Sequence, residues 1–242
     1  MSDLFLELRD DHDINLYKAD YSKDGLLRIE RLFPDHVAEQ IHNILVNQTP
    51  WHLVHANAAK AHQYYRPEVW RAKPAEERTK ILNQVALQAR DGFSYLYACY
   101  PMIQSYLKGL DPDWPLHAMT EFLNTYEVLK FVKDITGEQS CNKLDCQATL
   151  YSNGHFLNTH YDTGDTADRR VAYVMSFTKN WPANWGGQLL MLQDDDTVET
   201  GFTPSFNSLT LFKVPRRHIV TQVANFAGHG RYSITGWLLD EM

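Results

Sequence analysis

Histidine and aspartate, two residue types that bind metal ions, lie two positions apart in the tripeptide His160-Tyr161-Asp162. At the end of a β-strand, residues i and i+2 point to the same side, so both side chains can bind one ion. Two imidazoles and one carboxylate form a facial triad for iron and leave the opposite face of the ion open. With eleven histidines in the chain, about one His-x-Asp is expected by chance, so an ordinary surface pair is the alternative.

His218 is the leading candidate for the third ligand. It follows Val214-Pro215-Arg216-Arg217 and begins an apolar run, which predicts a strand start. Two other histidines compete for the role, His155 and His229. His155 has the wrong parity to share a strand face with His160, and His229 lies in a glycine-flanked loop. A core histidine with satisfied hydrogen bonds is the alternative reading of His218.

Arg231 is a candidate for anchoring an organic cosubstrate beside such a metal. Iron needs a two-electron donor before oxygen can hydroxylate a substrate, and a donor such as 2-oxoglutarate has a distal carboxylate that needs a buried cation. Arg231 begins the segment RYSITGWLL, in which Thr235 and Trp237 share its strand face. We expect this strand to lie beside the one that begins at His218, with Tyr151 adding a hydroxyl. A surface salt bridge for Arg231 and a core position for Tyr151 are the alternatives.

Helical periodicity dominates before about residue 140. Helices are predicted at 35–46, from 74 to about 97, and at 120–135, where Gly137 ends the last one. One strand is predicted at 26–33. These helices are expected to pack on one sheet as a buttress.

After residue 140 the chain changes to short strands separated by turn residues. The predicted strands are 145–151, 156–160, 170–177, 188–193, 208–212, 219–223 and 232–240. Strands spaced this closely are typical of a sandwich or jelly roll. The predicted fold class is α+β, mainly β, with a jelly-roll core in 140–242 and largely helical support in 1–139.

The composition is that of an ordinary globular protein, with 44% hydrophobic and 22% charged residues. A net charge of −7 without a Lys/Arg stripe disfavours nucleic-acid binding. No apolar run could span a bilayer and the acidic N-terminus lacks a signal-peptide pattern, so we expect a cytoplasmic protein that binds no membrane. Cys99, Cys141 and Cys146 lack disulfide or zinc-site spacing and are expected to be reduced thiols. The oligomeric state is not indicated.

Three other segments have two interpretations each. The segment 51–70 is rich in Trp, Tyr and His and is either a substrate-side lid or a packed loop. Gly186-Gly187 is interpreted as a turn entering a strand rather than a phosphate cradle, since no helix follows. Asp194-Asp195-Asp196 is interpreted as a solvated hairpin tip rather than a metal cluster.

Four segments, taken in order, resemble the 2-oxoglutarate/Fe(II) dioxygenases of the prolyl-hydroxylase class: LYSNGHFLNTHYD, RRVAYVMSFTKNW, GGQLLML and PRRHIVTQVANFAGHGRYSITGWL. The preceding LKFVKDITG is similar to the segment before the catalytic strands of that class. Within the class, the chain most resembles the N-terminal catalytic domain of eukaryotic hydroxylases that modify a proline of a small ribosomal-subunit protein. The resemblance covers roughly residues 119–240 and, before them, only LLRIERLFP.

The resemblance implies a double-stranded β-helix core that binds Fe(II) and the cosubstrate 2-oxoglutarate, with ascorbate as a reductant. The metal ligands that it implies are His160, Asp162 and His218. The cosubstrate residues that it implies are Arg231, for the C5 carboxylate, and the pocket-lining Tyr151, Thr235 and Trp237.

Two features depart from the family pattern. Ser176 lies where many relatives carry a tyrosine, so we expect one hydrogen bond to the cosubstrate to be supplied differently, for example through water. Arg231 lies thirteen residues after His218, a longer gap than in many relatives, so the FAGHG loop is expected to bulge.

The predicted function is the hydroxylation of an unactivated C–H bond of a prolyl residue in a protein, using O2 and releasing succinate and CO2. One catalytic domain is expected to cover residues 1–242. Two alternatives stay open: the same chemistry on a free amino acid or small metabolite, and a non-catalytic jelly-roll module that binds or senses. Specificity is expected to reside in the loops 50–75 and 163–169, where Asp165 and Asp168 are candidates for contacting the substrate.

Overall fold

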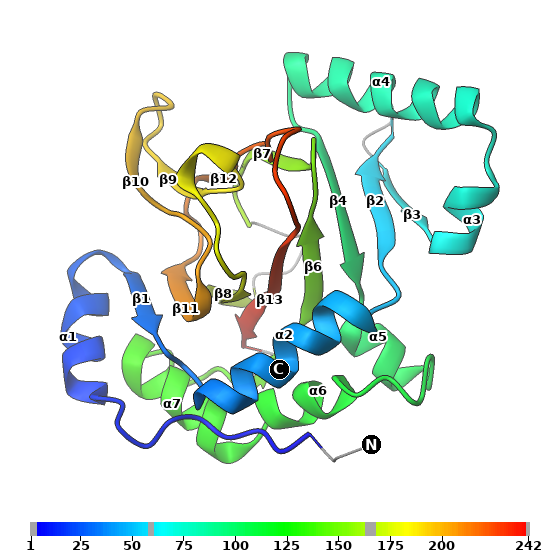
Figure 1. The fold of residues 1–242 in the computed structure, drawn as a ribbon. Coiled ribbons are helices and arrows are strands. Elements are labelled where there is room, and N and C mark those ends of the chain that lie inside the picture. Colours follow the sequence, from blue (N-terminus) through cyan, green and yellow to red (C-terminus); the bar gives the residue numbers. More distant parts are fainter. Residues whose placement is uncertain (1–3, 58–60, 163–167, 241–242) are drawn as a thin grey trace.

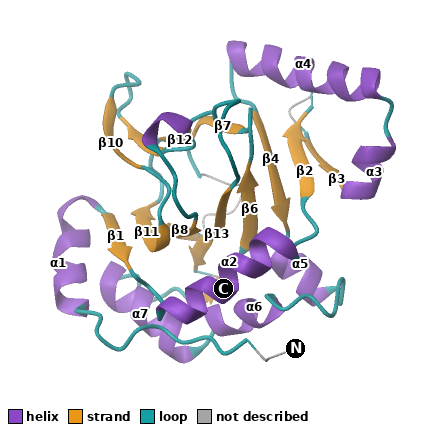
Figure 2. Ribbon diagram, in the orientation of Figure 1, coloured by secondary structure: helices purple, strands orange, loops and turns teal. Residues whose placement is uncertain are grey.

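The computed structural model describes residues 4–57, 61–162 and 168–240, shown in Figures 1 and 2. Its helices are α1 (Ile14–Asp24), α2 (Asp35–Asn47), α3 (Pro67–Ala72), α4 (Ala75–Asp91), α5 (Met102–Leu107), α6 (His117–Leu123), α7 (Tyr126–Thr136) and the 3-10 helix η1 (Ala183–Trp185). Over these ranges, no helix has the length and apolar character needed to cross a membrane.

The strands form one large curled sheet. They are β1 (Leu26–Glu30), β2 (His52–Ala56), β3 (His62–Tyr65), β4 (Tyr95–Tyr100), β5 (Lys143–Leu144), β6 (Gln147–Tyr151), β7 (Phe156–His160), β8 (Arg169–Phe177), β9 (Leu189–Leu192), β10 (Val198–Phe202), β11 (Phe206–Lys213), β12 (His218–Val220) and β13 (Arg231–Leu239). Their order is β1-β11-β8-β13-β6-β4-β7-β12-β9-β10. Off this path, β2 pairs with β4, β3 pairs with β2, and β5 pairs with β13.

The sheet curls into a half-barrel because β4 pairs with both of its halves. Residues 98–100 of β4 pair with β6, and residues 95–96 pair with β7, both antiparallel. The half that contains β8, β13 and β6 therefore lies across from the half that contains β7, β12 and β9 (Figure 1). Residues of both halves line one cavity. The predicted fold class, α+β and mainly β with a double-stranded β-helix core, is confirmed.

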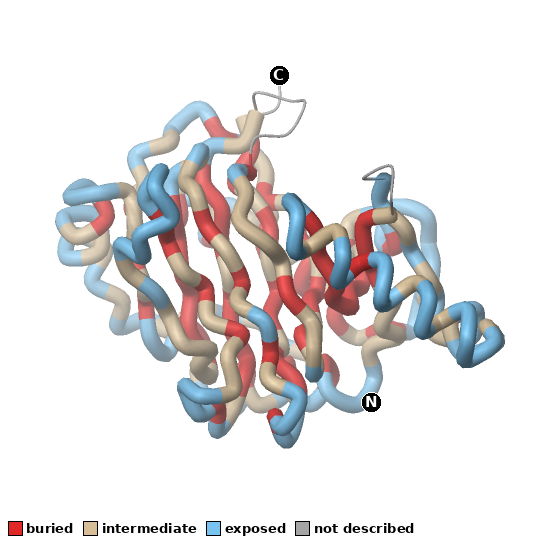
Figure 3. The backbone as a smooth tube through the Cα atoms, turned by 90° about the horizontal axis from the view of Figure 1, so that it is seen from above, coloured by how far each residue is buried: buried red, intermediate tan, exposed pale blue. Residues whose placement is uncertain are grey.

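Helices cover the outer face of the half that contains β8. Successive residues of a strand point to opposite faces. Val171 and Met175 of β8 pack in the main core with Val37 of α2 and Val132 of α7, whereas Val174 lines the cavity. Figure 3 shows the buried residues running along the central strands, with the exposed ones at the turns. This buttress makes one face of the strands rigid and leaves the other free for a site.

Local sequence patterns predicted the bounds of several helices and strands correctly. The strand predicted at 156–160 is β7, and the helix predicted at 35–46 is α2 with one residue more. The helix predicted at 120–135 is instead two helices, α6 and α7. The side chain of Thr125 accepts a hydrogen bond from the backbone N–H of Val128 and so caps a new helix start within the predicted one.

The helix predicted from residue 74 to about 97 is wrong over its last part. The helix α4 ends at Asp91, before Gly92, and the aromatic run YLYACY forms β4. All six residues of β4 are buried. A strand buried on both faces has no alternation, so its short apolar run cannot be distinguished from a helix by period.

The segment 51–70 contains the β2–β3 hairpin and the start of α3, so the packed-loop interpretation is wrong. Strand β2 extends the sheet by pairing with β4, and His62 of β3 lines the central cavity. The hairpin therefore borders the cavity at His62, and its role as a substrate-side lid stays a prediction.

Gly186 and Gly187 form the turn between η1 and β9 that the sequence predicts, with φ angles of 72° and 64°. A Cβ at Gly186 would lie 2.0 Å from the carbonyl oxygen of Gln222, and one at Gly187 would lie 3.3 Å from Cδ of Arg231. Only glycine combines this backbone conformation with this close approach. The turn thereby aligns β9 beside β12.

Gly186→Ala is expected to destabilise the protein strongly, because it adds a backbone overlap to a left-handed φ. Gly109→Ala is the matched control, since Gly109 has a φ of 61° but nothing within 4 Å of an added Cβ. The left-handed conformation alone costs about 1–2 kcal/mol. Thermal unfolding should therefore show the larger loss of Tm for Gly186→Ala, and equal losses would contradict the steric argument.

Candidate metal and cosubstrate site

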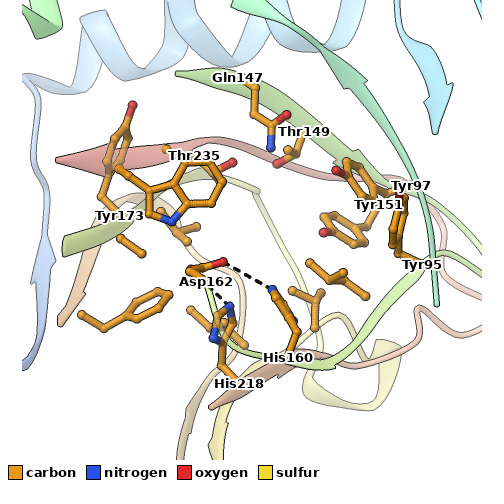
Figure 4. Close-up of a pocket in the computed structure, with 18 of the residues that line it drawn as sticks. Tyr95, Tyr97, Gln147, Thr149, Tyr151, His160, Asp162, Tyr173, His218 and Thr235 are labelled. Atoms are coloured by element: carbon orange, nitrogen blue, oxygen red, sulfur yellow. Dashed lines mark ion pairs between the residues drawn. The ribbon is translucent and has the colours of Figure 1, made fainter. Parts of the chain in front are cut away.

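Strands β7 and β12 bring two histidines face to face. His160 is the last residue of β7, His218 is the first of β12, and the antiparallel register pairs them directly. Their ring centroids lie 4.2 Å apart. Asp162 follows two residues after the end of β7, and its carboxylate points between the two imidazoles (Figure 4).

The three side chains leave room for one ion. Asp162 Oδ1 lies 3.5 Å from Nε2 of His160, and Oδ2 lies 3.6 Å from Nε2 of His218. Atoms that bind one ion at about 2.1 Å stand roughly 3–4 Å apart, so the spacing suits a shared metal. In the described part of the chain, this is the one group of three His, Cys, Asp or Glu side chains close enough to share an ion.

Backbone carbonyls orient both imidazoles. Nδ1 of His160 lies 2.8 Å from the carbonyl oxygen of Asn158, and Nδ1 of His218 lies 2.8 Å from that of Arg216. A carbonyl oxygen only accepts, so each Nδ1 carries the proton and donates it. The lone pair of each neutral ring is then on Nε2, on the side of Asp162, which is the arrangement that metal-binding histidines require.

Charge and burial favour the protonation states that a metal needs. Burial raises the pKa of Asp162, but the neighbouring imidazoles of His160 and His218 outweigh this effect, and the pKa is lowered overall. Burial and the nearby His160 lower the pKa of His218, against the opposing effect of Asp162. An ionised carboxylate and a neutral imidazole are the forms that bind a metal ion.

A cavity of about 360 Å³ opens beside these three residues. Polar side chains of β6 and β13 point into it, and a row of tyrosines forms one wall (Figure 4). The polar residues are Gln147, Thr149 and Thr235, and the tyrosines are Tyr95, Tyr97 and Tyr151. The rings of Tyr97 and Tyr151 stack with centroids 5.3 Å apart. Volume and lining suit a small organic molecule.

Arg231 is a buried cation in this cavity. The residue is 4% exposed, and its guanidinium carbon lies 4.9 Å from the ring centre of Tyr151, its cross-strand partner. Burial lowers the pKa of Arg231, but a guanidinium keeps its proton in proteins. Within the described residues its Nε has no hydrogen-bond partner. No carboxylate of the described residues contributes to the pKa of Arg231, so this buried cation suits an anion that binds in the cavity.

The expected neighbour of the Arg231 strand is wrong. Strand β13 pairs with β5, β6 and β8, whereas β12 pairs with β7 and β9. Arg231 therefore reaches the cavity from the other half of the sheet than the group of His160, Asp162 and His218, which we call the metal group. Thr235 and Trp237 do line the same cavity. The alternation within β13 predicts this shared face correctly, but local sequence does not reveal which strands become neighbours.

Sequence reasoning missed Arg169, the first residue of β8. Its guanidinium carbon lies 3.7 Å from the ring centre of Trp237, and its Nη1 donates to the carbonyl oxygen of Asp162 at 3.5 Å. It also missed the cavity side chains Gln147 and Thr149. Their alternation with the buried Ala148 within β6 was the available signal.

The remaining candidates lie elsewhere. His155 and His229 do not line the cavity, and neither does Asp168. The residues 194–196 form the exposed turn between β9 and β10, as predicted. Asp165 lies outside the described residues. The three cysteines are free and buried, in agreement with the expected reduced thiols.

We expect His160→Ala and His218→Ala each to weaken Mn(II) binding by more than about 100-fold. Mutation of residues that only orient a metal ligand already lowers metal affinity by about 10–100-fold. Isothermal titration calorimetry on the metal-free protein measures this affinity. His229→Ala is the control, since His229 lies outside the group and is exposed. An equal loss in His229→Ala would rule out the site.

Acid is expected to destabilise the metal-free fold through His155. Burial lowers the pKa of His155 from 6.5 to about 4. Between these values the unfolded chain binds a proton that the folded chain does not, so the free energy of unfolding falls as the pH decreases from 6.5 to 4, by up to about 3 kcal/mol. Urea unfolding at pH 7 and pH 5 should show a smaller difference for His155→Gln than for the wild type. Identical pH slopes would exclude His155 as the cause.

Comparison with known proteins agrees with this geometry. Residues 146–239 match the family model of the 2OG-Fe(II) oxygenase superfamily. A search of curated proteins gave no match. Among solved structures, a Pseudomonas putida prolyl-4-hydroxylase is 18% identical with a TM-score of 0.56, covering 95% of this chain and 100% of its own.

Two further structures share the fold over nearly their whole length. A 2OG-Fe(II) oxygenase family oxidoreductase from Burkholderia pseudomallei is 13% identical, with a TM-score of 0.61 and coverage of 100% of this chain and 97% of its own. A Trichoplax adhaerens prolyl hydroxylase, solved with a peptide fragment of the hypoxia inducible factor oxygen degradation domain, is 16% identical, with a TM-score of 0.55 and coverage of 94% and 89%. The segment 146–239, which carries both histidines, the aspartate and the buried arginine, is thus similar to the 2OG-Fe(II) oxygenase superfamily.

Proposed function

We propose that the protein is an Fe(II)- and 2-oxoglutarate-dependent dioxygenase that hydroxylates a prolyl residue of a protein and releases succinate and CO2. The observation that carries the proposal is one cavity that holds both a His-Asp-His group and a buried guanidinium whose Nε has no hydrogen-bond partner among the described residues. Such a cavity suits a cosubstrate that chelates a metal with one end and presents a carboxylate at the other. The family match supports the same chemistry.

In this proposal His160, Asp162 and His218 hold Fe(II), which supplies the activation of O2 when it is bound. The hydrogen bonds from the two Nδ1 atoms to backbone carbonyls keep both rings oriented before the metal arrives. The single carboxylate offsets one charge of the dication. The ligands come from one side only, so the cavity side stays open to cosubstrate and substrate.

Arg231 binds the C5 carboxylate of 2-oxoglutarate in this scheme. Exclusion of water strengthens such a charge-assisted hydrogen bond. Burial raises the pKa of Tyr151, although Arg231 opposes the shift, so the phenol beside the guanidinium keeps its proton and can donate. Thr235 and Trp237 line the same wall, and the indole N–H of Trp237 helps to lower the pKa of Asp162.

The pair formed by Arg169 and Trp237 suits a prolyl substrate next to the metal group. Stacking on the indole holds the guanidinium flat, beside the carbonyl of Asp162. A proline ring is apolar, lacks an N–H and is flanked by carbonyl oxygens. An aromatic surface with adjacent N–H donors matches those three properties. The peptide bound to the Trichoplax neighbour supports a protein substrate, while a cavity of about 360 Å³ keeps a free amino acid or small metabolite as the runner-up.

Turnover tests this proposal. With Fe(II), 2-oxoglutarate and O2, the protein should form succinate and add one oxygen to proline-containing peptides, including peptides from small ribosomal-subunit proteins, as seen by mass spectrometry. Ascorbate is expected to prolong turnover. His160→Ala should form no succinate, because the metal ligand is lost.

The controls separate the proposal from its rivals. Peptides with the proline replaced by alanine should gain no oxygen. Oxygen gain by free amino acids, with none on any proline peptide, would favour the metabolite alternative. If the wild type forms no succinate although it binds metal and 2-oxoglutarate, the non-catalytic binding module is the better account.

A further inference from the structure

A row of four hydroxyl side chains crosses the inner face of the sheet beside Arg231. Cross-strand register pairs Ser208 with Ser176, Ser176 with Ser233, and Ser233 with Thr149. All four are buried. The hydroxyls of Thr149 and Ser233 are hydrogen-bonded at 2.9 Å. Four adjacent strands thus present small polar residues at a level where bulky apolar ones would be usual in a protein interior.

A second, smaller cavity of about 20 Å³ lies along this row. Ser176, Ser208 and Thr210 line it. Val174, Leu189 and Arg231 line both this cavity and the central one. The two spaces therefore adjoin at the Arg231 side chain. A space of this size holds one water molecule, or a group of about the size of one methylene, if polar partners surround it.

The charges around the small cavity leave Arg231 as the group in need of an anion. Arg28 also lines it, but Arg28 forms an ion pair with Glu30 at 2.7 Å and donates to Ser205. Ser176 donates to the carbonyl oxygen of Ser205 at 2.5 Å, which leaves its lone pairs free to accept. Arg231 has neither an ion pair nor a partner for Nε within the described residues. A hydroxyl rotates, so Ser176 can turn its single proton from the carbonyl oxygen of Ser205 to an arriving carboxylate.

We propose that this small cavity, named here the Ser176 chamber, extends the carboxylate subsite of Arg231 and lets the protein bind a 2-oxo diacid one methylene longer than 2-oxoglutarate. The inference rests on the proposed function. 2-Oxoglutarate contacts Arg231 directly and Ser176 through one water molecule. The six-carbon homologue, 2-oxoadipate, displaces that water and places its distal carboxylate between Arg231 and the hydroxyls of the chamber.

The affinities of the protein for the two acids, measured separately, test the chamber. Mn(II)-loaded full-length protein is titrated calorimetrically with 2-oxoglutarate and with 2-oxoadipate, and the wild type should bind them within about tenfold of each other. Ser176→Val fills the chamber and removes its hydroxyl. This variant should weaken the binding of 2-oxoadipate by more than about tenfold and the binding of 2-oxoglutarate by less than about threefold. The reason is that room for one methylene in a tight pocket changes affinity by about 10–200-fold.

Matched variants keep the result interpretable. Ser22→Val makes the same substitution at an exposed position of α1 and should change neither affinity. If Ser176→Val does not give a cooperative thermal unfolding transition, Thr210→Leu fills the same chamber from β11 and should give the same selective loss.

Each outcome decides one question. If the wild type binds Mn(II) but not 2-oxoglutarate, the proposed function itself fails. If 2-oxoglutarate binds and 2-oxoadipate binds more than about tenfold more weakly to the wild type, only the chamber is overturned. Equal losses of affinity for both acids in Ser176→Val also overturn the proposal of the Ser176 chamber.

Discussion

The antiparallel pairing of β7 with β12 is the constraint on which the rest of the site depends. It places His160 opposite His218, at the edge of the cavity, and brings Asp162, two residues beyond the strand, close to both imidazoles. A slip of one residue would turn His218 to the other face of the sheet. The register is supported from the far side, because His218 also pairs with Met191 of β9, which the turn at Gly186 aligns.

Strands β8 and β13 serve the core and the cavity at once. One set of alternating side chains packs against the helices, and the other set lines the space beside the metal group. A buried guanidinium such as Arg231 costs stability unless an anion neutralises it. The packed face supplies the rigidity that keeps this unfavourable group in place, and in the proposed function the binding of a carboxylate would remove the cost.

Residue pattern alone predicted much of the candidate site. Alternation along a strand predicts that Arg231, Thr235 and Trp237 share a face, and all three line the cavity. Parity rejects His155, which lies outside the metal group. These predictions succeeded because they depend only on the two-residue period of a strand, which is local. The run YLYACY failed for the complementary reason: a fully buried strand has no period to detect.

The sequence by itself determined which side chains can bind a metal or an anion, and on which strand faces they lie. Only the tertiary structure decided that Arg231 meets His160 and His218 across a cavity instead of along neighbouring strands, and that Arg169 stacks on Trp237 beside them. Strand pairing depends on how the whole sheet curls, with β4 joining its two halves. That curl arises from packing between segments distant in the chain, which no local pattern of residue types encodes.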